Sequence, residues 1–204
     1  GVDVPIDKLI TEMLSNKEFY LQNDGGITIS GGEALHQLDA CIELARRTHL
    51  NGLTVALDTT GLIPLEPNLE RLKELLGYVD CVLMDFKAGT DEMHSKLCKF
   101  KLERAKAFAK LCSDMGVEMW IRHVVLKHYN AEDDYDLKQI LEFVKTLDTV
   151  TEFDLLPFHN FGSYKWEQCG IEYKCSDDNV PDESDMIRKY ELVKRELPHV
   201  KVTR

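Results

Sequence analysis

Hydrophobic positions in this chain follow two patterns, short apolar runs and longer stretches with helical spacing. The apolar runs predict strands at 27–30, 54–59, 81–87, 119–125 and 152–158. These runs are nearly continuous rather than alternating, as expected of parallel strands that are covered on both faces. The pattern therefore favours a parallel sheet.

Between the runs, apolar residues recur at the i, i+3, i+4 spacing of amphipathic helices. The first such stretch precedes all the strands and has Pro5 near its start. Helices are predicted around 6–14, 35–45, 65–76, 102–112, 137–144 and 186–193. The alternation of strands and helices predicts an α/β fold in one domain over 1–204, with helices on the outer face of the sheet.

Polar or charged groups lie at or just past the end of each predicted strand. They are Glu33, Asp58, Asp85, Lys87, Arg122 and His159. In a β/α barrel the C-terminal strand ends meet at one mouth, where such enzymes carry their active sites. Because these groups share the same relative place, we expect them to form one site.

The turn after the first strand, Ser30-Gly31-Gly32-Glu33, has a specific chemical interpretation. Glycines remove side chains where a ligand could touch the backbone. The Glu33 carboxylate suits an ammonium group, and the helix that follows offers free backbone N–H groups at its start. A tight strand-to-helix turn would explain the same residues.

One long segment, 159–181, shows neither helical nor strand spacing and holds several aromatic residues. Loops of this length in compact domains are often functional, and the aromatic residues argue against simple disorder. Both a functional lid and a loop packed under its own side chains fit the segment.

Composition narrows the class of protein. The chain has 204 residues, 44% of them hydrophobic, and a net charge of -11, which argues against nucleic acid as the main partner. No apolar run approaches the roughly 20 residues needed to span a bilayer, and the chain opens with no signal-peptide pattern, so no membrane partner is expected. Its six cysteines are scattered, which indicates a reducing cytoplasm.

Five motifs occur in the order and spacing of a known family. They are Ser30-Gly31-Gly32-Glu33, Leu57-Asp58-Thr59-Thr60-Gly61, Met84-Asp85-Phe86-Lys87, Trp120-Ile121-Arg122 and Leu155-Leu156-Pro157-Phe158-His159. Over nearly its whole length the chain resembles the glycyl-radical-enzyme activating enzymes, which are radical S-adenosylmethionine (SAM) proteins. The resemblance implies a partial (β/α) barrel and SAM as a cofactor. It also implies a [4Fe-4S] cluster that reduces SAM, so that a glycyl radical forms on a partner enzyme such as pyruvate formate-lyase.

The resemblance implies nine cofactor-binding residues: Gly31, Gly32, Glu33, Asp58, Asp85, Phe86, Lys87, Arg122 and His159. In the family the Gly-Gly-Glu turn holds the amino group of the SAM methionine moiety, and the strand edge at 85–87 contacts SAM. By the same resemblance, His159 matches an adenosine-side contact and Arg122 a basic group inside the mouth. Thr60 stands where the family usually has Asn, which weakens any role for that position.

The family binds its cluster through a Cys-x3-Cys-x2-Cys loop after the first barrel strand, and no such spacing occurs here. We therefore expect no cluster ligand in this chain. The resemblance implies a piece with about five of six βα units, whose cluster cysteines lie upstream of Gly1. By itself, the chain is then expected to be inactive.

The implied partners are a glycyl radical enzyme and an electron donor such as flavodoxin or ferredoxin. We assign contact with the glycyl radical enzyme to Tyr164, Lys165 and Trp166 in the long segment, because Trp and Tyr are enriched at interface hot spots. Three alternatives remain open. One is a cluster-free SAM- or nucleotide-binding module, and another is an interaction protein that keeps the barrel scaffold. The third is a hydrolase or lyase in which His159 acts as a base with Asp58.

Overall fold

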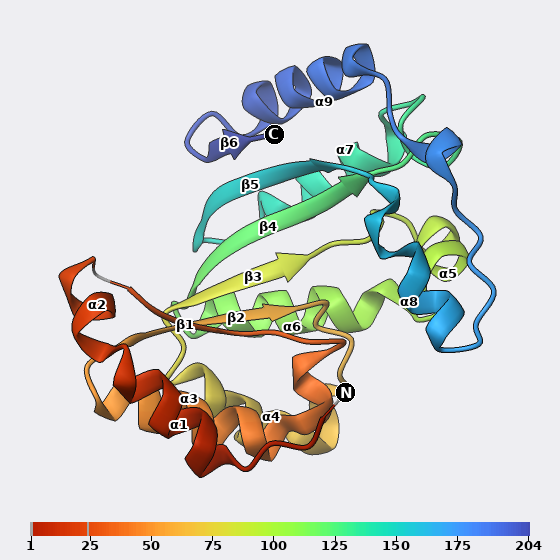
Figure 1. The fold of residues 1–204 in the computed structure, drawn as a ribbon. Coiled ribbons are helices and arrows are strands. Elements are labelled where there is room, and N and C mark those ends of the chain that lie inside the picture. The colour runs from red at the N-terminus through yellow and green to blue at the C-terminus, as the bar shows by residue number, and fades with distance from the viewer. Residues whose placement is uncertain (1, 24) are drawn as a thin grey trace. The chain divides into compact units, whose positions relative to one another are not determined.

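The computed structural model describes residues 2–23 and 25–204 (Figure 1). Gly1, where the predicted domain begins, lies outside the described residues. The chain divides into two compact units. The first comprises the residues up to Asp85 together with Glu103–Trp120 and Leu147–Thr149, and the second comprises Phe86–Leu102, Ile121–Thr146 and Val150–Arg204. The prediction of a single domain over 1–204 stays a prediction.

Among the described residues, six strands form one sheet in the order β1-β2-β3-β4-β5-β6, which does not close on itself in this part of the chain. Their bounds are β1 Gly26–Ile29, β2 Thr54–Thr59, β3 Cys81–Asp85, β4 Glu118–Val125, β5 Val150–Pro157 and β6 Lys201–Thr203. The parallel α/β fold is thereby confirmed. The first five strands match the apolar runs, except that β3 stops at Asp85 and leaves Lys87 beyond it.

In the first unit, helices lie along one side of β1, β2 and β3 (Figure 1). They are α1 Ile6–Ser15, α3 Leu38–Leu50, α4 Leu65–Leu76 and α6 Leu102–Asp114. The unit also contains α2 Lys17–Gln22 and the 3-10 turn η1 Ala34–Gln37. Along β2, Val55, Leu57 and Thr59 are buried, whereas Ala56 and Asp58 are half-buried. Because successive strand residues point to opposite faces, Asp58 lies on the face opposite Leu57.

The second unit holds α5 Asp91–Cys98, α7 Tyr135–Val144, α8 Ser163–Gln168, α9 Glu183–Glu196 and the 3-10 turns η2 Asn160–Gly162 and η3 Asp177–Asn179. Strand β5 pairs in parallel with β6, with Glu152 opposite Lys201. The Lys201 Nζ donates to the Glu152 carboxylate at 2.8 Å. Helix α9 packs against both strands and α7.

The segment 159–181 is not a plain loop, because it contains the short helix α8. None of the residues of α8 is buried. A helix without a buried face has no apolar stripe, and this explains why the hydrophobic spacing did not predict it. Within the described part of the chain, no helix is both long and apolar enough to cross a membrane.

Candidate functional site

Glu33 connects the ends of the first two strands. Its carboxylate accepts hydrogen bonds from the Thr59 and Thr60 hydroxyls, each at 2.5 Å, and from the Thr60 backbone N–H at 2.9 Å. It also accepts from the Leu35 N–H at 3.1 Å, which caps the start of η1. The carboxylate therefore fixes the turn after β1 to the end of β2.

These hydrogen bonds determine the charge of Glu33. Burial alone would raise its pKa, but the bonds from Thr59, Thr60 and the Leu35 N–H outweigh burial and hold the pKa below 4.5. The carboxylate is thus ionised at neutral pH. The turn carries a fixed negative charge at the C-terminal ends of β1 and β2.

The glycines beside Glu33 leave the backbone open. A Cβ added at Gly31 or Gly32 would meet no atom within 4 Å, and Gly31 has a φ of +147°, which L side chains rarely adopt. A cavity of about 200 Å³ adjoins this turn and is bordered by residues of α1, η1 and α3. Since ligand pockets for drug-sized molecules measure about 300–1,000 Å³, this cavity suits a fragment the size of an amino acid.

The other predicted residues of the first unit share one sheet face. The Ser30 hydroxyl donates to Asp58 Oδ2 at 2.9 Å, a second link between β1 and β2. Asp58 is in register with Leu83 on β3, and Asp85 lies one alternation further along that strand. Asp58 and Asp85 therefore lie on the same half-buried face.

Thr59 and Thr60 are site residues that the sequence did not assign. Thr60, which stands where the resemblance expects Asn, provides two of the hydrogen bonds to Glu33. Their position in the sequence could have indicated this role, because both are polar residues at the end of an apolar strand.

The second unit holds the remaining predicted residues. Phe86 is buried, and its N–H donates to the Arg122 carbonyl at 2.9 Å, so the structure joins these two backbones. Lys87 and Arg122 are half-buried. His159 follows β5 and is exposed, and its ring stacks on Phe161 with the centroids 4.7 Å apart. Beside it, the buried Asn160 Oδ1 has no hydrogen-bond partner among the described residues.

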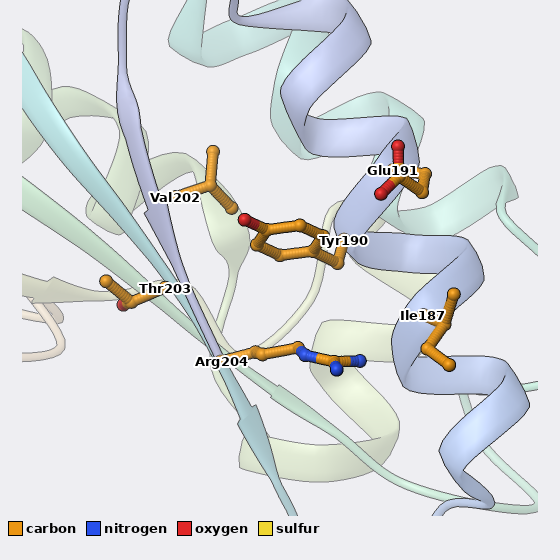
Figure 2. Close-up of a pocket in the computed structure, with 6 residues that line it drawn as sticks. All are labelled: Ile187, Tyr190, Glu191, Val202, Thr203 and Arg204. Carbon is orange, nitrogen blue, oxygen red and sulfur yellow. The ribbon is translucent and has the colours of Figure 1, made fainter.

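A larger cavity of about 550 Å³ lies between α9 and β6 in the second unit (Figure 2). The Arg204 guanidinium lies over the Tyr190 ring, 5.6 Å from its centroid. None of the predicted site residues lines this cavity. It is therefore separate from the candidate site.

The fold and the strand-end residues define a class of protein. The chain belongs to the radical SAM superfamily, whose family model matches residues 3–143. Members of this superfamily use SAM and a [4Fe-4S] cluster.

Within this superfamily, the chain is similar to enzymes of one kind. The chain is 33% identical over 193 residues to the pyruvate formate-lyase-activating enzyme of Staphylococcus epidermidis, covering 94% of this chain and 76% of that protein. The Staphylococcus aureus enzyme of the same name is 32% identical over the same coverage.

Two solved structures share the fold. One is a domain of the pyruvate-formate lyase-activating enzyme of Bacteroides vulgatus, with a TM-score of 0.69 and 23% identity over 88% of this chain and 98% of that one. The other is Streptococcus suis SuiB bound to S-adenosylmethionine, with a TM-score of 0.73 and 14% identity over 100% of this chain and 44% of that one.

The cysteines of this chain do not fit a [4Fe-4S] cluster. Such a cluster is held by Cys thiolates, yet the described residues contain no group of three or more His, Cys, Asp or Glu that could hold a metal. Burial raises the pKa of Cys41 to about 11 and that of Cys112 to about 12, which keeps both thiols protonated. That the cluster ligands lie upstream of Gly1 stays a prediction.

The lowered pKa of Glu33 predicts a pH-dependent stability. The ionised carboxylate contributes stability above pH 4.5, its pKa in the unfolded chain, and this contribution is lost as the pH falls through the lower folded pKa. The unfolding free energy of wild type should therefore exceed that of Glu33→Gln near neutral pH, and the gap should shrink as the pH falls below about 4.5. Urea unfolding at stepped pH measures this gap. A gap that stays constant across the range would contradict the assignment.

Proposed function

We propose that this chain binds SAM at the Glu33 turn and belongs to an activase that forms a glycyl radical on an enzyme of the pyruvate formate-lyase type. The observation that carries the proposal is the ionised Glu33 carboxylate, held at the ends of β1 and β2 beside the open Gly31-Gly32 backbone. The names of the staphylococcal relatives support the reaction class.

The chemistry of the turn suits the ammonium of an amino acid. A carboxylate offers about four acceptor sites, and Glu33 already receives four hydrogen bonds. Two of the donors are the hydroxyls of Thr59 and Thr60. Each hydroxyl can turn away from Glu33, so that an ammonium group donates to Glu33 instead and the hydroxyl oxygen also accepts from the ammonium. Glu33 and the two hydroxyls would then hold the methionine end of SAM. When bound and reduced, SAM supplies the hydrogen-abstracting chemistry.

The other assignments are part of the same proposal. Asp58 and Asp85 contribute polar groups to one face of the first unit. In the second unit, Lys87, Arg122 and His159 contribute contacts to SAM, and Phe86 contributes its backbone. Flavodoxin or ferredoxin is proposed as the electron donor. The six free cysteines support the proposed cytoplasmic location. We propose no nucleic-acid or membrane partner, and the net charge of -11 supports the absence of a nucleic-acid partner.

Two measurements test the proposal. Calorimetric titration of the chain with SAM should show saturable binding, and free methionine should compete for it. Anaerobic iron reconstitution of the full-length gene product should give a brown protein that cleaves SAM. If SAM does not bind, the site assignment is wrong. If SAM binds but the reconstituted protein neither takes up iron nor cleaves SAM, a cluster-free binding module is the better interpretation.

We place the glycyl radical enzyme contact at α8, as proposed from the sequence. Tyr164, Lys165 and Trp166 are all exposed there, and the Trp166 ring packs on Tyr173 with the centroids 5.5 Å apart. The side chain of Phe161, just ahead of the helix, is 82% exposed. Exposed aromatic side chains of this kind are typical anchors of protein interfaces.

In the reconstituted full-length gene product, Trp166→Ala should slow activation of the partner at least about tenfold, the loss expected from an interface anchor worth over about 1.4 kcal/mol. SAM cleavage without partner should be unchanged. Phe19→Ala, which removes an exposed aromatic side chain from α2, is the matched control and should affect neither activity. Equal loss of both activities in Trp166→Ala would place Trp166 in the SAM site or in the packing of the unit.

A further inference from the structure

A buried histidine, His123, lies beside Phe86 in the second unit. His123 is 1% exposed, and β4 places it on the same buried face as Ile121 and Val125. Its Nδ1 lies 2.8 Å from the Phe86 carbonyl oxygen. A histidine on an apolar strand face must satisfy both ring nitrogens, since a buried unpaired polar group is costly.

The partners of His123 determine its tautomer. The Phe86 carbonyl accepts only, so Nδ1 carries the proton and donates. The Asn130 Nδ2 lies 3.3 Å from His123 Nε2 and 3.1 Å from the Val124 carbonyl, so it donates one hydrogen to each. The Asn130 Oδ1 accepts from the Leu126 N–H at 2.7 Å. The neutral imidazole is thus fully paired.

Burial is the main cause that lowers the pKa of His123, although the Phe86 carbonyl and Asp136 act in the opposite direction. The charges of Lys189 and Lys87 lower it further. The neutral ring that the hydrogen bonds require is therefore also the form that its surroundings favour.

His123 contacts the first residue of the segment from Phe86 to Thr90, and a second buried group, Asp136, contacts its last two residues. The Asp136 carboxylate is 5% exposed and accepts from the Gly89 N–H at 2.9 Å and from the Thr90 N–H at 3.0 Å. It also accepts from the Thr90 hydroxyl at 3.1 Å. Because the hydroxyl hydrogen points to Asp136, the Thr90 oxygen is free to accept from the Met93 N–H at the start of α5. Asp136 therefore fixes both the segment after β3 and the helix that follows.

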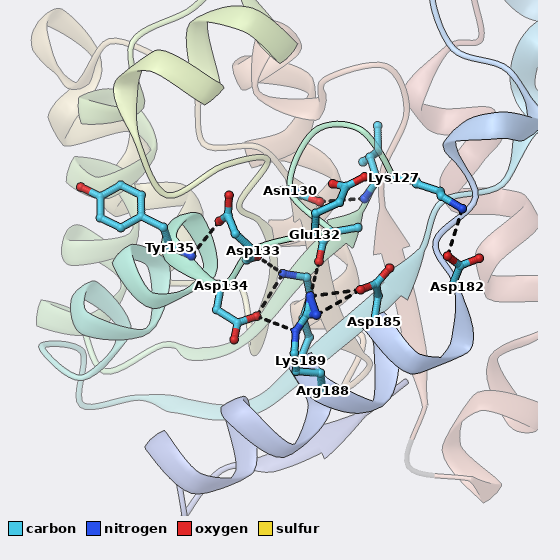
Figure 3. A network of polar contacts seen from close by, with 12 residues as sticks. Lys127, Asn130, Glu132, Asp133, Asp134, Tyr135, Asp182, Asp185, Arg188 and Lys189 are labelled. Atoms are coloured by element: carbon cyan, nitrogen blue, oxygen red, sulfur yellow. Dashed lines mark hydrogen bonds and ion pairs between the residues drawn. The ribbon is translucent and has the colours of Figure 1, made fainter.

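The loop that carries Asn130 is itself anchored to α9 (Figure 3). The buried Lys189 Nζ donates to the Asp133 carbonyl at 2.7 Å, and Arg188 contacts the Asp134 carboxylate at 3.2 Å. These bonds hold residues 131–134 close to α9. The residues that directly follow Asn130 are in this way held by α9.

We propose that His123 and Asp136 are positioning residues, which clamp the segment from Phe86 to Thr90 at its two ends and thereby hold Lys87 in place for SAM. The claim that this clamp affects SAM binding rests on the proposed function. Lys87 lies between the two fixed points, so loosening either end would let its backbone move. Neither His123 nor Asp136 needs to touch SAM to act in this way.

Hydrogen exchange and SAM titration of the full chain test the clamp together. His123→Leu removes the donor to Phe86, and Asp136→Asn replaces one acceptor oxygen with a donor. Each should speed exchange in the segment from Phe86 to Thr90 at least about tenfold and weaken SAM binding about fivefold. His123→Asn, which keeps a side-chain N–H near the position of Nδ1, should restore most of both. Leu141→Ala removes packing from the core of α7 and serves as a destabilised control.

The outcomes separate the clamp from the SAM site. Faster exchange with weaker SAM binding in the two clamp variants, but not in Leu141→Ala, supports the inference. Unchanged exchange in both variants overturns the clamp. Faster exchange with unchanged SAM affinity, or an equal loss of affinity in Leu141→Ala, overturns the positioning role. If the wild-type chain does not bind SAM, the proposed function is wrong, and so is the claim that the clamp affects SAM binding. The exchange rates would still show whether His123 and Asp136 hold the segment from Phe86 to Thr90.

Discussion

Replacing Glu33 with alanine is expected to weaken SAM binding at least about tenfold, or about 1.4 kcal/mol. The variant removes the negative charge that would pair with the SAM ammonium, and it leaves the hydroxyls of Thr59 and Thr60 without their common acceptor. Hydrogen bonds to charged groups contribute about 1.5–3 kcal/mol each, so the first unit should also lose stability. Calorimetry with SAM and urea unfolding measure the two effects separately.

Asp85→Ala should weaken SAM binding by a similar factor if the end of β3 contacts the ligand. Glu43→Ala is the matched control, because it removes a carboxylate from α3 that binds Arg46 and Arg47 on the surface. Its SAM affinity should equal that of wild type. Unchanged affinity in both Glu33→Ala and Asp85→Ala would show that SAM binds elsewhere.

Gly89→Ala should destabilise the second unit by about 3 kcal/mol, at the upper end of the cost of overpacking. An added Cβ would lie 2.0 Å from the Asp136 carbonyl oxygen and 2.9 Å from the Ile140 backbone nitrogen. Backbone atoms cannot turn aside as a flexible side chain can, so the segment after β3 must separate from the first turn of α7.

The control for this prediction is Gly162→Ala, because a Cβ at Gly162 would meet no atom within 4 Å. Its backbone is already in the right-handed helical region at the start of α8. We expect its unfolding free energy to stay within about 0.5 kcal/mol of wild type. An equally small effect in Gly89→Ala would mean that α7 is free to shift away from the segment.

The sequence predicted those elements that bury an apolar face. Strand β2 and helix α7 match their apolar patterns closely, because burial enforces the spacing. Helices α2, α5 and α8 were not predicted. Helices α2 and α8 contain no buried residue, and the buried residue of α5 is the polar His94. Strand β6 has only three residues, too few for any periodicity to show.

Some residues of the candidate site could likewise be predicted from the sequence, and others could not. Glu33, Asp58 and Asp85 could be found because each lies at or near the end of an apolar run. The bonds of Asp136 to Gly89 and Thr90 join residues 47 and 46 positions apart, and nothing in one sequence indicates such a pair. His123 left a usable signal, because it is a polar residue on the buried alternation of β4. Its contact with the Phe86 carbonyl required the fold.

The uneven burial of the cysteines makes site-selective labelling practicable. Cys169 is exposed at the end of α8, directly after the proposed partner contact. Cys41 and Cys112 are buried, and their raised pKa values keep them as unreactive thiols near neutral pH. A maleimide dye added briefly at neutral pH should therefore attach first at Cys169. Such a dye would sit close to Trp166, and its fluorescence would report when another protein covers that helix.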